Sequence, residues 1–361
     1  MLDSSQMVGV DLFCGVGGLT HGLVAAGIRV AAGIDIDPAC RFPYETNNAA
    51  KFIQRNVTTL KTQEINELFG GAKLKLLAGC PPCQPFSTYA WRYRLDKDDP
   101  RRSLINEFWR IAQGIMPDVI VMENVPLINL EPDFNDFVDH LVGCGYYVSH
   151  SVIDCSQYGV PQRRRRRILM ASRHGAIKLI PPVTRRPKTV RQAIGNLPPL
   201  GAGQADPGDP LHVAAALSPK NLERIRHSIQ GGTWKDWPSH LVTPCHQSQR
   251  GNSYADIYGR MAWDEPSPTL TTKCYGFGNG RFGHPEQDRG ISLREAAILQ
   301  SFPPNYAFLP SGTRVEFKTM GRLIGNAVPV ELGRVIGFSI LRHFNIETPS
   351  CAVEPQDLQY R

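Results

Sequence analysis

Short apolar runs alternate with helix-like segments over the first 180 residues of this 361-residue chain. The pattern predicts strands at 8–13, 30–34, 74–78, 119–122, 146–153 and 167–171, with helices at 19–26 and 134–142. Strands that alternate with helices are typical of a doubly wound α/β sheet, in which functional residues gather at the carboxyl ends of the strands. The residues that follow each apolar run are therefore the first candidates for a functional site.

The strand–helix alternation is lost after residue 180. Ten of the 29 prolines fall within residues 181–244, and residues 181–262 hold ten Lys or Arg against five Asp or Glu. We expect a loop-rich lobe over 181–319, helices at 292–300 and 330–343, and a loosely ordered tail at 346–361. The basic excess indicates a polyanionic partner, although a solvated basic surface explains the charge alone at least as simply.

The composition disfavours a membrane-spanning, exported or zinc-binding protein. A hydrophobic content of 42% and a charged content of 20% are those of an ordinary globular protein. Because no apolar stretch reaches the length of a membrane span and the first residues do not resemble an export signal, we expect a cytoplasmic protein. Nine cysteines without framework spacing fit a reducing compartment. Cys80 and Cys83 have Cys-x-x-Cys spacing, but no second half of a zinc site follows, so no metal is expected.

The segment 79–87 reads Gly-Cys-Pro-Pro-Cys-Gln-Pro-Phe-Ser and follows the apolar run 74–78. Its two adjacent prolines stiffen the backbone and end the strand, so one cysteine is presented on a rigid loop at the carboxyl end of that strand. An exposed and aimed thiol suits a nucleophile better than a structural role. The residues alone leave open whether Cys80 or Cys83 is that nucleophile.

A glycine turn, residues 14–18, follows the first predicted strand. Glycines let the backbone approach a ligand closely, and the start of the next helix offers free amides. A dinucleotide fingerprint would need glycine where Thr20 stands, which disfavours a nicotinamide-dependent oxidoreductase. Asp35, at the end of the second strand, is placed to accept hydrogen bonds from ribose hydroxyls. Taken singly, a plain tight loop and a helix cap explain these two features equally well.

Glu123 and a run of five arginines, 163–167, flank two later strands. Glu123 follows an apolar run and places a carboxylate at the working edge of the sheet, where it could equally serve as a structural hydrogen bonder. The arginines lead into a strand, so alternate side chains should face opposite sides of the sheet. One set can then enter the site, whereas a charge run is more commonly solvated surface.

Together these segments resemble the cytosine-C5 DNA methyltransferase family. The similar segments are, in chain order, the cofactor motif 11–18, the nucleophile motif 79–87, the acidic motif Glu123-Asn124-Val125, the arginine motif Gln162-x-Arg164-x-Arg166, the element 260–269 that supports the recognition region, and the carboxy-terminal motif 325–329. The six motifs occur in family order and span roughly residues 8–340.

The resemblance implies a mechanism and its catalytic residues. Cys83, which follows proline and precedes glutamine as in the family motif, adds to C6 of a cytosine flipped out of duplex DNA, while Cys80 packs. The methyl group of S-adenosyl-L-methionine then passes to C5, without a metal, before the C5 proton and the thiolate leave. Glu123 would hold the N3/N4 edge and Arg166 would contact O2, with Arg164 in a supporting role.

The resemblance also implies the binding residues and the organisation of the chain. The expected cofactor contacts are Phe13, Gly15, Gly17, Asp35, Ile36, Asn56 and Asn326. The candidate DNA contacts are Gln84 and Ser87 beside the nucleophile, and Arg185, Arg186 and Arg250, which could equally read bases or contact phosphate. Asn56 stands where the family often has aspartate. We expect a catalytic domain at 1–180 plus 320–345 and a target-recognition domain at 181–319.

The expected protein is a monomer that methylates double-stranded DNA within a restriction-modification system, alongside a cognate restriction endonuclease. Two alternatives share the fold. One methylates cytosine in RNA, but its branch carries a Cys-Phe-Thr element that this chain lacks. The other is a catalytically silent homologue, which the presence of Cys83, Glu123 and Arg166 disfavours.

Overall fold

A computed structural model describes residues 6–82, 104–182, 186–247 and 256–347 of the chain. The chain divides into two compact units, residues 1–158, 165–184 and 328–361 on one hand and residues 159–164 and 185–327 on the other. The first unit holds the predicted strands and the second the predicted loop-rich lobe, but residues 159–164 and 320–327 group with the second unit. The catalytic and target-recognition roles of these units stay predictions.

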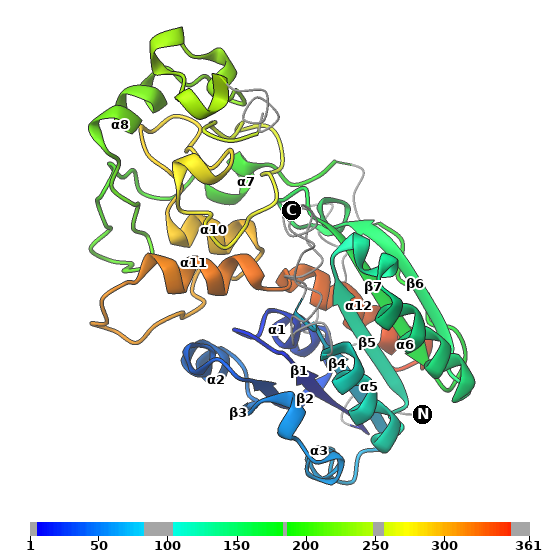
Figure 1. Cartoon of the computed structure of the whole chain (residues 1–361). Helices are drawn as coiled ribbons and strands as arrows, with labels where there is room; N and C mark the ends of the chain where they lie inside the picture. Colours follow the sequence, from blue (N-terminus) through cyan, green and yellow to red (C-terminus); the bar gives the residue numbers. More distant parts are fainter. Residues whose placement is uncertain (1–5, 83–103, 183–185, 248–255, 348–361) are drawn as a thin grey trace. The chain divides into compact units, whose positions relative to one another are not determined.

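The first unit is built on a seven-stranded sheet with the order β3-β2-β1-β4-β5-β7-β6 (Figure 1). Strands β1 to β5 pair in parallel, whereas β7 runs antiparallel to both of its neighbours, β5 and β6. The strands are β1 (Met7–Leu12), β2 (Arg29–Asp35), β3 (Lys51–Gln54), β4 (Leu74–Gly79), β5 (Val119–Asn124), β6 (Tyr147–Asp154) and β7 (Arg165–Ser172). The sheet and its helices confirm the predicted α/β class.

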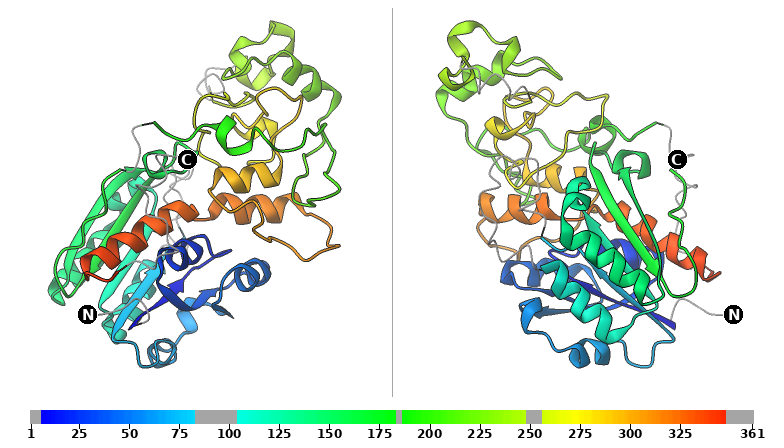
Figure 2. Two further views of the ribbon diagram at one scale, coloured as in Figure 1. Left: turned by 180° about the vertical axis from the view of Figure 1, so that it is seen from behind. Right: turned by 45° about the vertical axis from the view of Figure 1, so that its right-hand side comes forward.

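Helices cover both faces of this sheet, and Figure 2 shows α12 on the face opposite α5 and α6. One face packs apolar strand residues such as Val10 and Leu12 against Ile65 of α3, Phe108 of α5 and Phe137 of α6. The α-helices of this unit are α1 (Gly18–Ala26), α2 (Arg41–Asn47), α3 (Thr62–Leu68), α5 (Leu104–Ile115), α6 (Pro132–Gly143) and α12 (Val330–His343). Its 3-10 helices are η2 (Pro38–Cys40), η3 (Val57–Thr59), η5 (Pro126–Leu130) and η6 (Cys155–Tyr158).

On the other face, α12 packs directly against α1 because glycines line the contact. A Cβ atom on Gly22 of α1 would lie 2.3 Å from the carbonyl oxygen of Val330, and one on Gly333 of α12 would lie 2.8 Å from the carbonyl oxygen of Leu19. The two helix backbones therefore approach more closely than any side chain would allow. This contact returns the end of the chain to the strand–turn–helix unit where the chain began.

The segment Phe317–His343 is long and apolar enough to pass a composition test for a membrane span, but 89% of its most apolar window is buried inside the structure. Pro329 separates the segment into α11 (Phe317–Asn326) and α12. Burial and the break at proline are those of core helices in a globular fold.

The second unit is loop-rich. Besides α11, its α-helices are α7 (Val190–Ile194), α8 (Pro219–Arg226) and α10 (Leu293–Leu299), and its 3-10 helices are η7 (Trp234–Asp236), η8 (Ser239–Leu241), η9 (Pro244–Gln247) and η10 (Phe277–Asn279). Among its described residues, β-structure is confined to isolated bridges. A small, largely aromatic core joins α8, η7, η8 and η10 and is formed by Ile225, Trp234, Trp237, Leu241 and Phe277.

Candidate functional site

The glycine turn between β1 and α1 is held open by backbone geometry. Phe13, Gly15 and Gly17 all have positive φ angles, of 57°, 53° and 90°. The amide of Gly15 donates to Oδ2 of Asp35 at 2.9 Å, so the end of β2 anchors the turn at the end of β1. A Cβ atom on Gly15 would meet no described atom within 4 Å. The turn therefore borders open space, and glycine is needed for its conformation rather than for room.

Asp35 occupies a second position at this edge of the sheet. Its Oδ1 accepts from the amide of Asp37 at 2.9 Å while Oδ2 accepts from Gly15. Burial raises the pKa of Asp35 above its usual value, and these two amide hydrogen bonds oppose the rise. Ile36, the next residue, is 63% exposed, which is unusual for a large apolar side chain.

Asp11 lies beneath the turn and is almost completely buried. Its Oδ2 accepts from the Thr20 hydroxyl at 2.7 Å, and that hydroxyl lies 3.0 Å from the hydroxyl of Tyr44. Its Oδ1 has no hydrogen-bond partner among the described residues. Burial raises the pKa of Asp11 from 3.8 to about 7, and the charge of Asp35 adds to the rise. Asp11 belongs to the cofactor motif 11–18, but the sequence analysis predicted no separate role for this residue.

The remaining predicted cofactor residues fall into both units. Asn56, after β3, uses its side-chain oxygen to accept from the amide of Thr58 at 3.1 Å and so caps η3. Asn326 is the exposed last residue of α11 in the second unit. Phe13, Gly15, Gly17, Asp35 and Ile36 lie in the first unit at the carboxyl ends of β1 and β2.

The loop after β4 is tied to β5. The register pairs Gly79 with Met122, which places Cys80 beside Glu123 on the neighbouring strand. The side-chain amide of Asn124 donates to the carbonyl oxygen of Pro81 at 3.1 Å and fixes the start of the proline segment. Cys83, Gln84 and Ser87 lie outside the described residues.

Cys80 is in an environment that keeps its thiol protonated. Burial raises the pKa of the Cys80 thiol well above its usual range, and the negative charges of Glu123 and Asp11 raise it further. Because the thiolate is the nucleophilic form, such a thiol is a poor nucleophile at neutral pH. The environment of Cys80 thus supports a packing role for this residue.

Glu123 and Arg166 form a buried ion pair on the adjacent strands β5 and β7. Nε of Arg166 lies 2.8 Å from Oε1 of Glu123, and the two side chains are 13% and 8% exposed. Oε1 has this ionic partner but no hydrogen bond among the described residues. Nη1 of Arg166 donates to the carbonyl oxygen of Arg165 at 2.7 Å. The pair presents a carboxylate with unused hydrogen-bonding capacity beside a guanidinium.

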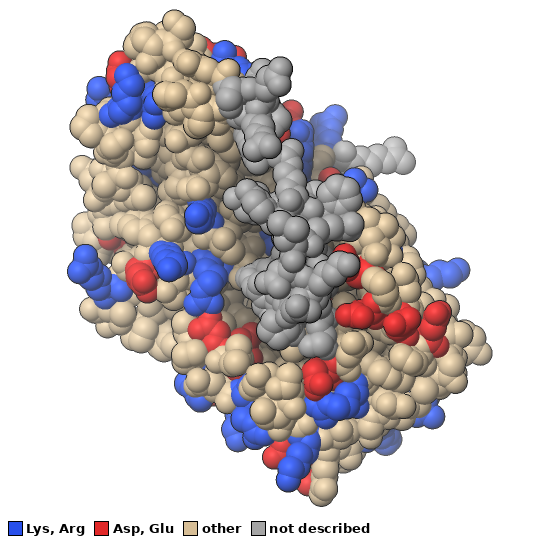
Figure 3. Space-filling view, in the orientation of Figure 1, with Lys and Arg blue, Asp and Glu red and all other residues tan. Residues whose placement is uncertain are grey.

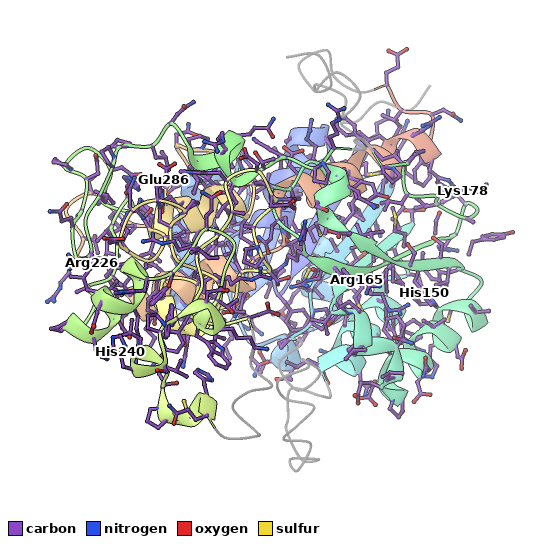
Figure 4. The ribbon with its side chains drawn as sticks, turned by 90° about the horizontal axis from the view of Figure 1, so that it is seen from above. His150, Arg165, Lys178, Arg226, His240 and Glu286 are labelled. Carbon is purple, nitrogen blue, oxygen red and sulfur yellow. The ribbon has the colours of Figure 1, made fainter. Side chains whose placement is uncertain are left out.

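The five arginines divide between the two units. Arg165 is exposed and Arg167 donates to the carbonyl oxygen of Pro126 at 3.2 Å, while Arg166 faces Glu123, so the expected alternation holds within β7. Figure 4 labels Arg165 on β7 and His150 on the neighbouring strand β6. Arg164 lies before the strand, in the second unit, where backbone carbonyls surround its guanidinium. Its observed contacts are structural.

Arg260 organises the interior of the second unit. Its guanidinium donates to the carbonyl oxygens of Ser228, Ile225, His284 and Gln287, at distances of 2.6 to 2.9 Å, and to Oδ1 of Asp288 at 2.5 Å. A buried arginine that satisfies so many backbone groups holds the surrounding loops together.

Charge is distributed unevenly over the surface. Figure 3 shows acidic side chains gathered over α6, which carries Asp133, Asp136 and Asp139, and basic side chains over α8, which carries Lys220, Arg224 and Arg226. Arg186 is exposed, while Arg185 and Arg250 lie outside the described residues. Within the described part of the chain, no group of three or more His, Cys, Asp or Glu side chains could hold a metal ion.

Comparisons with known proteins place the chain among described families. Residues 7–342 match a family model described as C-5 cytosine-specific DNA methylase. The chain is 51% identical over 344 residues to the type II methylase M.HgiDII of Herpetosiphon aurantiacus, covering 93% of this chain and 96% of that protein. It is 31% identical over 341 residues to the type II methyltransferase M1.HphI of Haemophilus parahaemolyticus, covering 92% and 86%.

A solved structure has the same fold. It is a putative DNA modification methyltransferase encoded within a prophage of E. coli, with a TM-score of 0.72 and 22% sequence identity over 94% of this chain and 99% of that one. At this identity the likeness concerns the fold alone.

Proposed function

Because the chain belongs to the C-5 cytosine-specific DNA methylase family and is a DNA cytosine-5-methyltransferase, we propose that it methylates a flipped cytosine within one specific duplex sequence. The methyl donor is S-adenosyl-L-methionine, and the enzyme is the modification partner of a type II restriction endonuclease. The family names of its relatives support this setting. We further propose that it acts as a cytoplasmic monomer.

The described residues at the ends of β1 and β2 fit this cofactor. The turn at Gly15 borders open space, Ile36 offers an exposed apolar side chain, and the buried Oδ1 of Asp11 has no described partner. Such a set suits a ligand with an aromatic base, ribose hydroxyls and a positive charge. When bound, S-adenosyl-L-methionine supplies an electrophilic methyl group. Phe13, Gly15, Gly17, Asp35, Ile36, Asn56 and Asn326 are the residues proposed to hold it.

Cys83 supplies the nucleophile in this proposal. Its sulfur forms a bond to C6 of cytosine, which makes C5 electron-rich enough to accept the methyl group. The C5 proton then leaves as the C5–C6 double bond re-forms, and the sulfur–C6 bond breaks to release thiolate. The environment of Cys80, which favours the neutral thiol, supports the choice of Cys83.

The buried pair of Glu123 and Arg166 is the observation that carries this proposal. Addition of a thiolate to C6 places negative charge on the ring, and a fixed acid and a fixed cation offset it where it develops. Oε1 of Glu123 has no hydrogen bond among the described residues, so it is available to the N3/N4 edge of cytosine. Arg166 holds the carboxylate in place and is assigned to O2.

The second unit is proposed to read and hold DNA. Flipping the cytosine costs about a few kcal/mol, which contacts to the phosphate backbone must offset. Arg185, Arg186 and Arg250 are the proposed DNA contacts of this unit, with Gln84 and Ser87 beside the nucleophile. The basic side chains on α8 supply further positive charge.

Bisulfite sequencing of DNA from a host that expresses the protein tests the function and reveals the target sequence. We expect 5-methylcytosine within one short motif, and none in cells that express Cys83→Ser. Incubation of the purified enzyme with duplex DNA or structured RNA and labelled cofactor separates the two nucleic acids. Label in RNA alone, or in neither substrate, would contradict the proposal.

A further inference from the structure

Three buried polar side chains of the second unit form a continuous network, which joins Gln162 and Arg164 of the arginine motif to Gln300, a residue outside the assigned motifs. Gln162 and Gln300 are fully buried and Arg164 is 3% exposed. Nε2 of Gln162 donates to Oε1 of Gln300 at 3.0 Å, and Nη1 of Arg164 donates to Oε1 of Gln162 at 3.4 Å. The three side chains therefore act as one hydrogen-bonded unit.

The network has two sets of contacts, called arms below. The first arm hydrogen-bonds the carboxyl end of α11. Nε2 of Gln300 donates to the carbonyl oxygen of Ile324 at 2.9 Å, and Nη2 of Arg164 donates to the carbonyl oxygens of Gly325 and Ala327 at 3.2 and 3.4 Å. The carbonyl oxygen of Ile324 also accepts from the amide of Ala327 at 3.3 Å, so Gln300 adds a second donor there, while Arg164 supplies donors to the two carbonyls that follow. The positive charge of Arg164 also suits the negative end of the helix dipole.

The other arm holds the segment that leads into β7. Oε1 of Gln162 accepts from the amide of Leu270 at 3.0 Å, and Nη1 of Arg164 donates to the carbonyl oxygen of Leu270 at 3.0 Å. Nε2 of Gln162 also donates to the carbonyl oxygen of Leu299, at the end of α10. Gln162 and Arg164 are thereby fixed to the loop at Leu270, and Arg166 follows Arg164 by two residues.

The chain passes from the second unit into the first at two points, after Arg164 and after Ala327. Each arm binds the residues just before one of these points. Asn326, assigned to the cofactor, lies within the segment that one arm caps. Arg166, assigned to cytosine, lies just beyond the residues that the other arm fixes. We propose that Gln300 and Gln162 are positioning residues for methyl transfer, Gln300 by holding Asn326 through the end of α11 and Gln162 by holding the approach to Arg166. The inference rests on the proposed function.

Each glutamine can be replaced by methionine, which keeps the volume and adds no charge. Either replacement also removes the hydrogen bond that the two glutamines share, so the arms are distinguished by the remaining contacts of each side chain. Gln300→Met removes the donor to Ile324, and we expect binding of S-adenosylhomocysteine, measured by calorimetry, to weaken about tenfold, since one buried hydrogen bond contributes about that much. At saturating cofactor its kcat should stay within about threefold of wild type.

Gln162→Met should have the opposite effect, lowering kcat rather than cofactor binding. It removes the acceptor for Leu270 and Arg164, and we expect kcat to fall about tenfold while binding of S-adenosylhomocysteine stays within about threefold. Gln192→Met is the matched control, because Gln192 is exposed and its side chain takes part in the cap of α7. It should leave both quantities at wild-type values.

A purely structural role would lower kcat and cofactor binding together in both variants, in proportion to their melting temperatures, and that result would overturn the inference. Unchanged binding in Gln300→Met would overturn it as well. A variant that fails to fold is replaced by Gln300→Leu or Gln162→Leu, which likewise remove the side-chain donor and acceptor without adding a charge. A wild-type protein that neither binds S-adenosylhomocysteine nor methylates DNA would instead contradict the proposed function.

Discussion

Replacing Asp11 by asparagine should change how the stability of the protein depends on pH. The Asp11 side chain is buried, its Oδ2 accepts from Thr20 at 2.7 Å, and its Oδ1 has no partner among the described residues. Desolvation raises its pKa from 3.8 to about 7, against the opposing effect of the Thr20 hydrogen bond. The folded protein therefore holds this proton more tightly than the unfolded chain does.

The sign and size follow from that difference in pKa. The stability that the proton confers is complete below pH 3.8 and is lost as the pH rises through about 7. A shift of about three pKa units corresponds to about 4 kcal/mol, of which about 3 kcal/mol falls between pH 5 and pH 8. An asparagine side chain carries no charge at any pH, so the Asp11→Asn variant should gain about that amount relative to wild type over this interval.

Urea unfolding at pH 5 and pH 8, followed by circular dichroism, measures this effect, because any constant cost of the amide cancels between the two conditions. Asp37→Asn is the matched control, since asparagine serves equally well at the cap that Asp37 forms. Asp35 also has a raised pKa, and the charge of Asp37 contributes to that rise, so the Asp37→Asn control also shows how far a change at Asp35 alters the slope. Parallel pH profiles for wild type and Asp11→Asn would refute the reasoning.

Three further predictions concern packing and charge. Gly22→Ala places a methyl group 2.3 Å from a carbonyl oxygen of α12 and should destabilise the fold by about 1–3 kcal/mol or more in thermal unfolding, whereas Gly71→Ala, where a Cβ meets no described atom within 4 Å, should not. Arg166→Lys keeps the charge but loses the planar guanidinium, so kcat should fall at least about tenfold, while Arg165→Lys on the exposed face should have little effect. Arg260→Met leaves buried carbonyls unpaired and should lower stability by about 3–5 kcal/mol; a smaller loss would show that the loops repack.

Much of the fold was predictable because its strands are marked locally. The runs around Val10 and Ile120 are buried and apolar, and Gly27, with a φ of 105°, ends α1 where the sequence indicates. The short edge strand β3 was missed because only Phe52 of its four residues is buried, which leaves no periodic signal. Helix α11 was missed because its residues were assigned to a family motif and to loops.

The candidate site was predictable in its members but not in its pairings. Asp35 and Glu123 were predicted as site residues because each lies at the end of a strand. The contact between Glu123 and Arg166 depends on the antiparallel register of β5 and β7, which no local sequence pattern specifies. Five consecutive arginines look alike in sequence, so nothing there shows that the chain passes between units after Arg164. Gln300 was missed because the hydrogen-bond partners of its side chain are 24 or more residues distant in sequence.

The most direct test of the proposed chemistry is covalent capture. Duplexes of random sequence that contain 5-fluorocytosine are incubated with enzyme and S-adenosyl-L-methionine, because fluorine cannot leave C5 as a proton does and the sulfur–C6 bond therefore persists. We predict a complex that survives denaturing electrophoresis with wild type and Cys80→Ala but not with Cys83→Ser, and captured DNA that shares one short motif. Capture by Cys83→Ser, or its loss in a folded Cys80→Ala, would contradict the assignment of the nucleophile.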